Sequence, residues 1–138
     1  MRKQLTFATM LLFILTGIAA GCKKESGESR SLKKKMEGKW QVSKIETTID
    51  GTATKVYTGA AADFFEFRND ENDQVEVGIA GDRILGTYAV FATDDFSLSL
   101  SGKILNSTTN TITDNNFEFT ATVQDANPKE VRKYFLRR

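Results

Sequence analysis

The chain has 138 residues, with one cysteine, one proline, no histidine, and 19 basic against 18 acidic side chains. The missing histidine excludes Ser-His-Asp and Cys-His catalysis and removes the commonest metal ligand, and a single cysteine excludes an internal disulfide. The near-neutral charge gives no reason to expect nucleic-acid binding. We therefore expect a protein that is not an enzyme and uses no cofactor or metal.

The first expected segment covers residues 1–21. Arg2 and Lys3 precede an apolar run over residues 5–20, a pattern typical of a secretory signal peptide. A membrane-spanning helix needs about 20 apolar residues, and this run is shorter. We expect the segment to be removed on export.

The run ends at Ala19-Ala20-Gly21-Cys22, which resembles the lipobox of bacterial lipoproteins, although leucine is usual where Ala19 stands. The resemblance implies that Cys22 becomes the acylated N-terminus and attaches the protein to a membrane, since two or more acyl chains anchor a protein stably. The alternative is ordinary cleavage that leaves a free thiol. The sorting rules of such lipoproteins, applied to Lys23, point to the cell envelope and its outer membrane, with the periplasmic or surface face left open.

The next residues predict a spacer and a short helix. Residues 23–30 are only Lys, Glu, Ser, Gly and Arg, a composition that cannot bury apolar surface, so we expect a flexible tether over residues 22–31 and one domain over residues 32–138. Leu32 and Met36, spaced four apart before Gly38, predict one or two helical turns. The lysines at 33–35 are expected to be solvated, with contact to anionic headgroups as the alternative.

The rest of the domain reads as strands joined by short polar turns. Residues 96–100 and 117–123 alternate strictly between apolar and polar side chains, as half-buried strands do. Weaker candidates are residues 39–49, 54–57, 63–68, 74–79, 84–92, 103–106 with 111–113, and 130–137. Such spacing predicts antiparallel hairpins in an all-β fold. We expect a single up-and-down barrel of about eight strands, with a β-sandwich as the alternative.

Gly38-Lys39-Trp40 opens the first of these strands. It resembles the G-x-W motif of lipocalins, and more closely the lipocalin-like domains of Bacteroidetes lipoproteins. The wider match includes Phe65-Glu66-Phe67, Gly86-Thr87-Tyr88 and the strand from Phe117. The resemblance implies that Gly38 and Trp40 close one end of the barrel and that an arginine stacks on the indole, with Arg132 and Arg137 both candidates. The alternative is a tryptophan that is ordinary core, with solvated arginines.

An eight-stranded barrel is just wide enough to be filled by its own side chains or to hold one small ligand. We expect a membrane-tethered module that binds a small hydrophobic or amphipathic ligand. The candidate lining residues are Phe65, Phe67, Tyr88, Phe96, Leu98, Phe117 and Phe119. The alternative is a filled barrel that acts as a structural or interaction lipoprotein with an unknown protein partner.

Two carboxylate pairs, Asp63 with Glu66 and Asp94 with Asp95, are the positions where acid-base chemistry could be sought. Asp94 and Asp95 fall in an expected turn, where aspartate caps its own backbone. The oxygen-rich run over residues 69–73 lacks the glycine and glutamate of an EF-hand loop. We predict no catalytic residue and no metal site.

Overall fold

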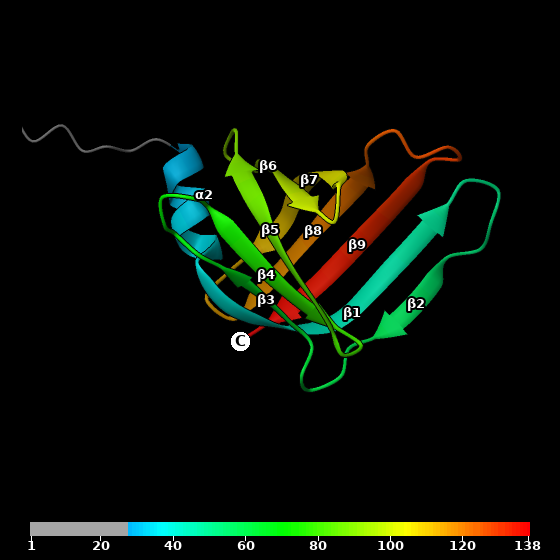
Figure 1. The fold of residues 1–138 in the computed structure, drawn as a ribbon, viewed down its shortest axis with the longest axis horizontal. Helices are drawn as coiled ribbons and strands as arrows, with labels where there is room; N and C mark the ends of the chain where they lie inside the picture. The colour runs from blue at the N-terminus through cyan, green and yellow to red at the C-terminus, as the bar shows by residue number, and fades with distance from the viewer. Residues whose placement is uncertain (1–27) are drawn as a thin grey trace, which may run out of the picture.

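A computed structural model describes residues 28–138 of the chain, with side chains from residue 32 onward, as one helix and nine strands (Figure 1). The elements are α2 Glu28–Met36, β1 Gly38–Ile49, β2 Lys55–Thr58, β3 Phe64–Phe67, β4 Gln74–Ile79, β5 Asp82–Val90, β6 Asp95–Leu100, β7 Lys103–Ile112, β8 Asn116–Val123 and β9 Glu130–Arg137. The expected signal peptide, Cys22 and most of the expected tether lie outside the described residues.

The strands form one antiparallel sheet that closes into an eight-stranded barrel with one extra strand. Strand β1 makes the closure, because it pairs with β3 and β2 along one edge and with β9 along the other. Trp40 is opposite Phe65 on one side, and Ile45 is opposite Tyr134 on the other. The expected barrel is confirmed, and the sandwich alternative is excluded.

The extra strand arises from an interruption beside β1. Strand β2 pairs with residues 44–47 of β1 and β3 with residues 38–41, so the two are parts of one strand position. The residues between β2 and β3 remain hydrogen-bonded to β1. The Val42 amide donates to the Asp63 carbonyl at 3.0 Å, and the Gly59 amide donates to the Ser43 carbonyl at 2.9 Å. A Cβ on Gly59 would lie 1.9 Å from the Val42 carbonyl oxygen, so the close approach requires glycine.

Helix α2 covers one end of the barrel and no described helix covers the other (Figure 1), and we call these the closed end and the open end. Helix α2 covers the closed end, where Leu32 and Met36 are buried and the helix contacts β5. The turns after β3, β5 and β7 and the end of β9 lie at this closed end. The turns after β1, β4, β6 and β8 lie at the opposite end, which no described helix covers.

The interior follows the period-two pattern that the sequence predicts. In β8, the residues Phe117, Phe119, Ala121 and Val123 are buried, while those between them are more exposed. Strand β6 shows the same alternation at Phe96 and Leu98. Both strongly patterned strands are therefore confirmed, with their apolar faces turned into the barrel.

Two expectations need correction. Strand β7 is one strand over Lys103–Ile112, not two pieces, because a register shift between Thr109 and Thr111 lets pairing with β8 continue. Helix α2 begins at Glu28, inside the segment assigned to the tether. Because the buried Leu32 and Met36 hold the last two turns of the helix on the barrel, the polar residues before them can continue the helix. Among the described residues, no helix has the length and apolar character needed to span a membrane.

Candidate functional site

The seven predicted lining residues all point into the barrel, in the half nearest α2. They come from β3, β5, β6 and β8, and none is more than 3% exposed. The structure brings together all of them in one buried cluster: Phe65, Phe67, Tyr88, Phe96, Leu98, Phe117 and Phe119.

Within this cluster the rings pack on one another. Phe119 lies 5.1 Å from both Phe96 and Phe117, measured between ring centroids, and 4.7 Å from Tyr134. These separations fall in the range at which aromatic pairs attract. The side chains of the closed half are thus partners of one another, and a ligand entering there would have to displace them.

Tyr88 is one of these residues, and its contacts are structural. Its hydroxyl donates to the Arg68 carbonyl at 2.9 Å, and its ring meets Phe67 at 5.3 Å. Burial raises the pKa of Tyr88 to about 12, with smaller contributions from nearby carboxylates such as Asp73. The phenol therefore stays protonated and holds the turn after β3.

Trp40 closes the barrel beneath α2. Its side chain is fully buried, its indole N–H donates to the Met36 carbonyl at 2.8 Å, and its ring lies 5.5 Å from Phe117. Gly38 adopts a φ of +106°, which favours glycine, where the chain turns from helix to strand. Gly38 and Trp40 therefore both lie at the closed end of the barrel, where the sequence predicts them.

The arginine over Trp40 is Arg138, so the expectation of Arg132 or Arg137 is wrong. The Arg138 guanidinium lies 3.8 Å from the centre of the indole and also donates to the Glu37 carbonyl. Tyr134 and Leu136 face inward, so alternation places residue 138 on the interior side at the closed end. That alternation was the signal in the sequence that could have identified it.

Arg137 and Arg132 have other positions. Arg137 is exposed on the outer face, next to Leu136. Arg132 lies near the other end of β9, close to the open end, and faces inward opposite Thr47 of β1 and Ala121 of β8. Neither can reach the indole at the closed end.

In the open mouth, Arg132 forms an ion pair with Glu130. Its side chain is 29% exposed, and its Nε donates to the Glu130 carboxylate at 2.6 Å. Burial raises the pKa of the Tyr134 phenol, while the hydrogen bond and the charge of Arg132 oppose that shift. Arg132 therefore remains charged and Tyr134 protonated at neutral pH.

The walls around Arg132 are small or apolar. The inward positions next to it along the sheet are Ala121 and then Ser107, which is 4% exposed. In the ring of eight strands, β9 is opposite β5, which β4 and β6 flank. Those two strands end at the mouth with Ile79 and Leu100, both partly buried against the core. The mouth thus combines the ion pair of Arg132 and Glu130 with an apolar facing wall.

The carboxylates considered for catalysis have structural roles. Asp63 is buried, and its Oδ2 accepts from the Tyr57 hydroxyl at 2.6 Å and the Ala60 amide at 2.8 Å, while its Oδ1 accepts from the Ala80 amide at 3.0 Å. Glu66 is on the outer face beside Arg68. Asp95 is the first residue of β6, and its carboxylate accepts from the hydroxyl of Thr108, the residue opposite it on β7. Within residues 28–138, no three acidic or cysteine side chains converge as metal ligands would.

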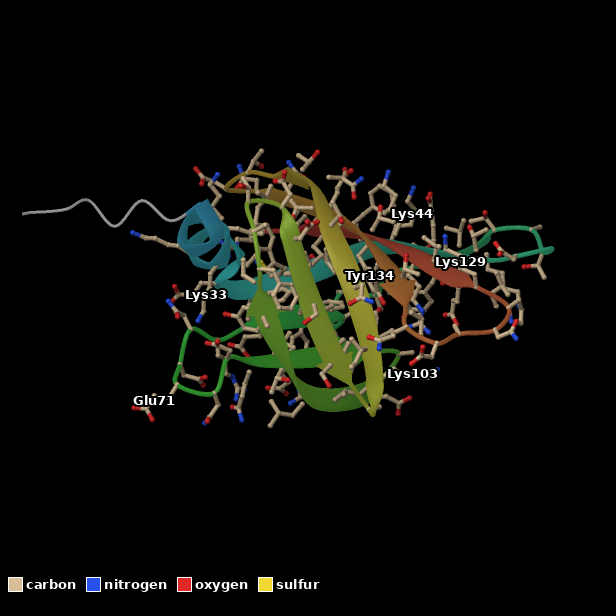
Figure 2. All side chains as sticks on the ribbon, turned by 90° about the horizontal axis from the view of Figure 1, so that it is seen from above. Lys33, Lys44, Glu71, Lys103, Lys129 and Tyr134 are labelled. Atoms are coloured by element: carbon tan, nitrogen blue, oxygen red, sulfur yellow. The ribbon has the colours of Figure 1, made fainter. Side chains whose placement is uncertain are left out.

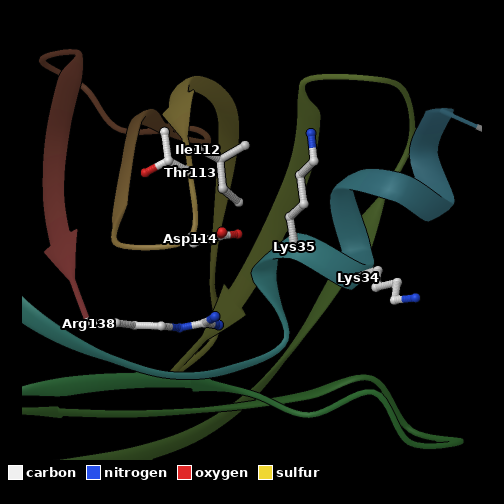
Figure 3. A pocket seen from close by; sticks show the side chains of 6 residues that line it. All are labelled: Lys34, Lys35, Ile112, Thr113, Asp114 and Arg138. Atoms are coloured by element: carbon white, nitrogen blue, oxygen red, sulfur yellow. The ribbon is translucent and has the colours of Figure 1, made fainter.

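Hollows also occur on the outer surface at and beside the closed end. One of about 360 Å³ lies between α2 and the turn after β7 (Figure 3). A second, of about 290 Å³, lies beside β1 and the end of β9, and Arg138 lines both. Comparison with protein-family models and with curated proteins finds no match to this chain.

Proposed function

We propose that this protein is a membrane-tethered, non-enzymatic binding module that takes a small amphipathic anion at the open mouth of its barrel. The closed half is occupied by packed rings, so the ligand site is assigned to the mouth and not to the seven residues named from the sequence. The single observation that carries the proposal is the inward, half-buried Arg132, paired with Glu130, on the strand across the barrel from the apolar ends of β4 and β6.

The chemistry of the mouth selects the ligand class. A guanidinium presents planar donors that suit a carboxylate, sulfonate or phosphate, and burial strengthens such a contact. Ile79 and Leu100 would receive the apolar part of the same molecule. An amphipathic anion uses both features, because the guanidinium has further N–H donors besides the Nε that bonds Glu130.

The tether belongs to the same proposal. The lipobox-like run ending at Cys22 supports acylation there, and the envelope location follows from it. A spacer of a few polar residues then joins the lipid to α2, which keeps the barrel near the bilayer.

Native mass spectrometry of protein purified from its own envelope tests the ligand. We expect an anionic amphipath to co-purify with the wild type and with Arg137→Gln, which removes an exposed charge from the same strand. Arg132→Gln should lose the ligand, by roughly tenfold or more in occupancy for a charge-assisted contact. Equal occupancy in the two variants, each with a wild-type melting curve, would remove Arg132 from the site.

A second function has one observation in its favour. The continuous ring packing of the closed half, including Phe65 against Tyr134 at 5.4 Å, suits a filled barrel whose outer face or loops bind an envelope partner. In that case no small molecule co-purifies, and affinity capture from solubilised envelope yields a stoichiometric protein.

A further inference from the structure

The closed end carries a group of five cationic side chains. Among the side chains that the structure describes, those from residue 32 onward, none of the five makes an ion pair with a carboxylate, whereas Lys33 pairs with Asp73 at 2.5 Å. We call this group the basic face, and it consists of Lys34, Lys35, Lys39, Arg137 and Arg138.

The basic face is continuous. Lys34, Lys35 and Arg138 line the hollow of about 360 Å³, and Lys39, Arg137 and Arg138 line the hollow of about 290 Å³ beside it. Figure 3 shows Arg138 reaching in from the end of β9 while Lys34 and Lys35 project from α2.

The acidic groups at this face are fewer than the basic ones. Asp114 lines the hollow of about 360 Å³, Asp63 lines the hollow of about 290 Å³, and Glu37 lines a neighbouring one with Lys34. Five cations against three carboxylates leave the lining of these hollows net positive. Lys39 also lies 4.3 Å from the Phe64 ring, which holds its ammonium at the surface.

An exposed aromatic side chain lies at the same end. Phe91 is 67% exposed in the turn after β5, the strand that α2 contacts. Cations and an exposed aromatic ring at one end of the barrel match the interface of a bilayer, where charges meet headgroups and rings lie at their level.

The expected position of the lipid indicates that the basic face meets a membrane. Cys22 precedes the first residue of α2 by six positions, and that much chain spans at most about 20 Å. An acylated Cys22 would therefore hold the closed end within reach of the headgroups, with the mouth at the other end of the barrel.

We propose that the basic face docks on the phosphate-bearing headgroups of an anionic membrane, so that the mouth opens away from the bilayer. This inference rests on the tether of the proposed function. It assigns to the lysines of α2 a contact with lipid, in place of the solvated role that the sequence favours.

Hydrogen exchange on the full acylated protein tests the docking. The protein is reconstituted in vesicles of phosphatidylcholine, alone or mixed with phosphatidylglycerol. We expect amides of residues 33–37 and 112–116 to exchange more slowly only in the mixed vesicles. The Lys34→Gln/Lys35→Gln variant should lower the docked-to-undocked ratio roughly thirtyfold, which corresponds to about 1 kcal/mol for each lysine.

A charge-matched control removes two lysines from the other end. Lys103 and Lys129 are exposed and lie far from α2 (Figure 2), so Lys103→Gln/Lys129→Gln should keep the protection. Equal protection in both kinds of vesicle, or equal loss in both variants, would overturn the docking. Protection by inorganic phosphate in phosphatidylcholine vesicles would assign the hollow to free phosphate and overturn the lipid assignment.

The failure of this inference can be distinguished from that of the proposed function. If the intact mass shows no acyl chains, the tether and the docking are both contradicted. If the mass shows acyl chains and exchange does not respond to phosphatidylglycerol, only the docking is contradicted, and binding at Arg132 is unaffected.

Discussion

Trp40 is held on three sides by groups that come from different parts of the chain. The Met36 carbonyl of α2 accepts its N–H, the Phe117 ring of β8 packs on it, and Arg138 lies over its face. Arg138 also bonds the Glu37 carbonyl, one of the last acceptors of the helix. A single cation thus joins the end of the chain to the start of the barrel.

Replacing Arg138 tests that role. We expect Arg138→Gln to lower the free energy of unfolding by about 1 to 2 kcal/mol, since it removes a cation–π contact and a hydrogen bond to the backbone. Arg137→Gln, an exposed neighbour, should change it by no more than about 0.5 kcal/mol. Chemical denaturation measures both, and equal effects would mean that the stacking contributes nothing.

Asp63 fixes the interruption between β2 and β3. Its carboxylate bonds Tyr57 of β2, the amide of Ala60 and the amide of Ala80 in the turn after β4. The hydrogen bond from Tyr57, together with that from Ala60, holds the pKa of Asp63 below its usual value. One ionised side chain therefore connects three elements that share no strand pairing at this point.

A depressed pKa predicts how stability depends on pH. The charged Asp63 stabilises the fold above its unfolded-state pKa of about 3.9, and that contribution is lost as pH falls through the lower folded-state value. Asp63→Asn should therefore be less stable than the wild type at neutral pH, with a gap that closes in acid. Asp125→Asn is the control, because its φ of 59° suits asparagine equally well. Thermal melts between neutral and acid pH would contradict this role if the gap stayed constant.

The elements that the sequence predicts best are those whose burial alternates. In β8 every second residue is apolar, and those same residues are buried in the structure. Strand β7 carries mainly threonine, serine and asparagine, whose side chains suit either face, so its continuity depends on pairing with β8 and β6 and not on its own pattern. The roles of Arg132 and Arg138 depend on where β9 meets each end of the barrel. Local sequence does not contain that information until the strand order is known.

At the scale of the whole molecule, the barrel divides into two parts. Rings from four strands and the indole of Trp40 fill the closed half, and α2 covers it. The open half contains the ion pair of Arg132 and Glu130 beside Tyr134, and buried aliphatic side chains such as Leu105 and Val123 lie in the same half (Figure 2 labels Tyr134). The packed rings of the closed half account for folding without a disulfide. The open half contains a charged side chain, Arg132, that packing alone does not require.

Backbone amide chemical shifts of the acylated protein in nanodiscs, titrated with anilinonaphthalene sulfonate as an anionic amphipath, test the central claim most directly. The proposed site predicts the largest changes at Thr47, Ala121 and Arg132, which surround the mouth. Largest changes at Phe65 and Phe117 instead would place the ligand among the packed rings and contradict the division of the barrel.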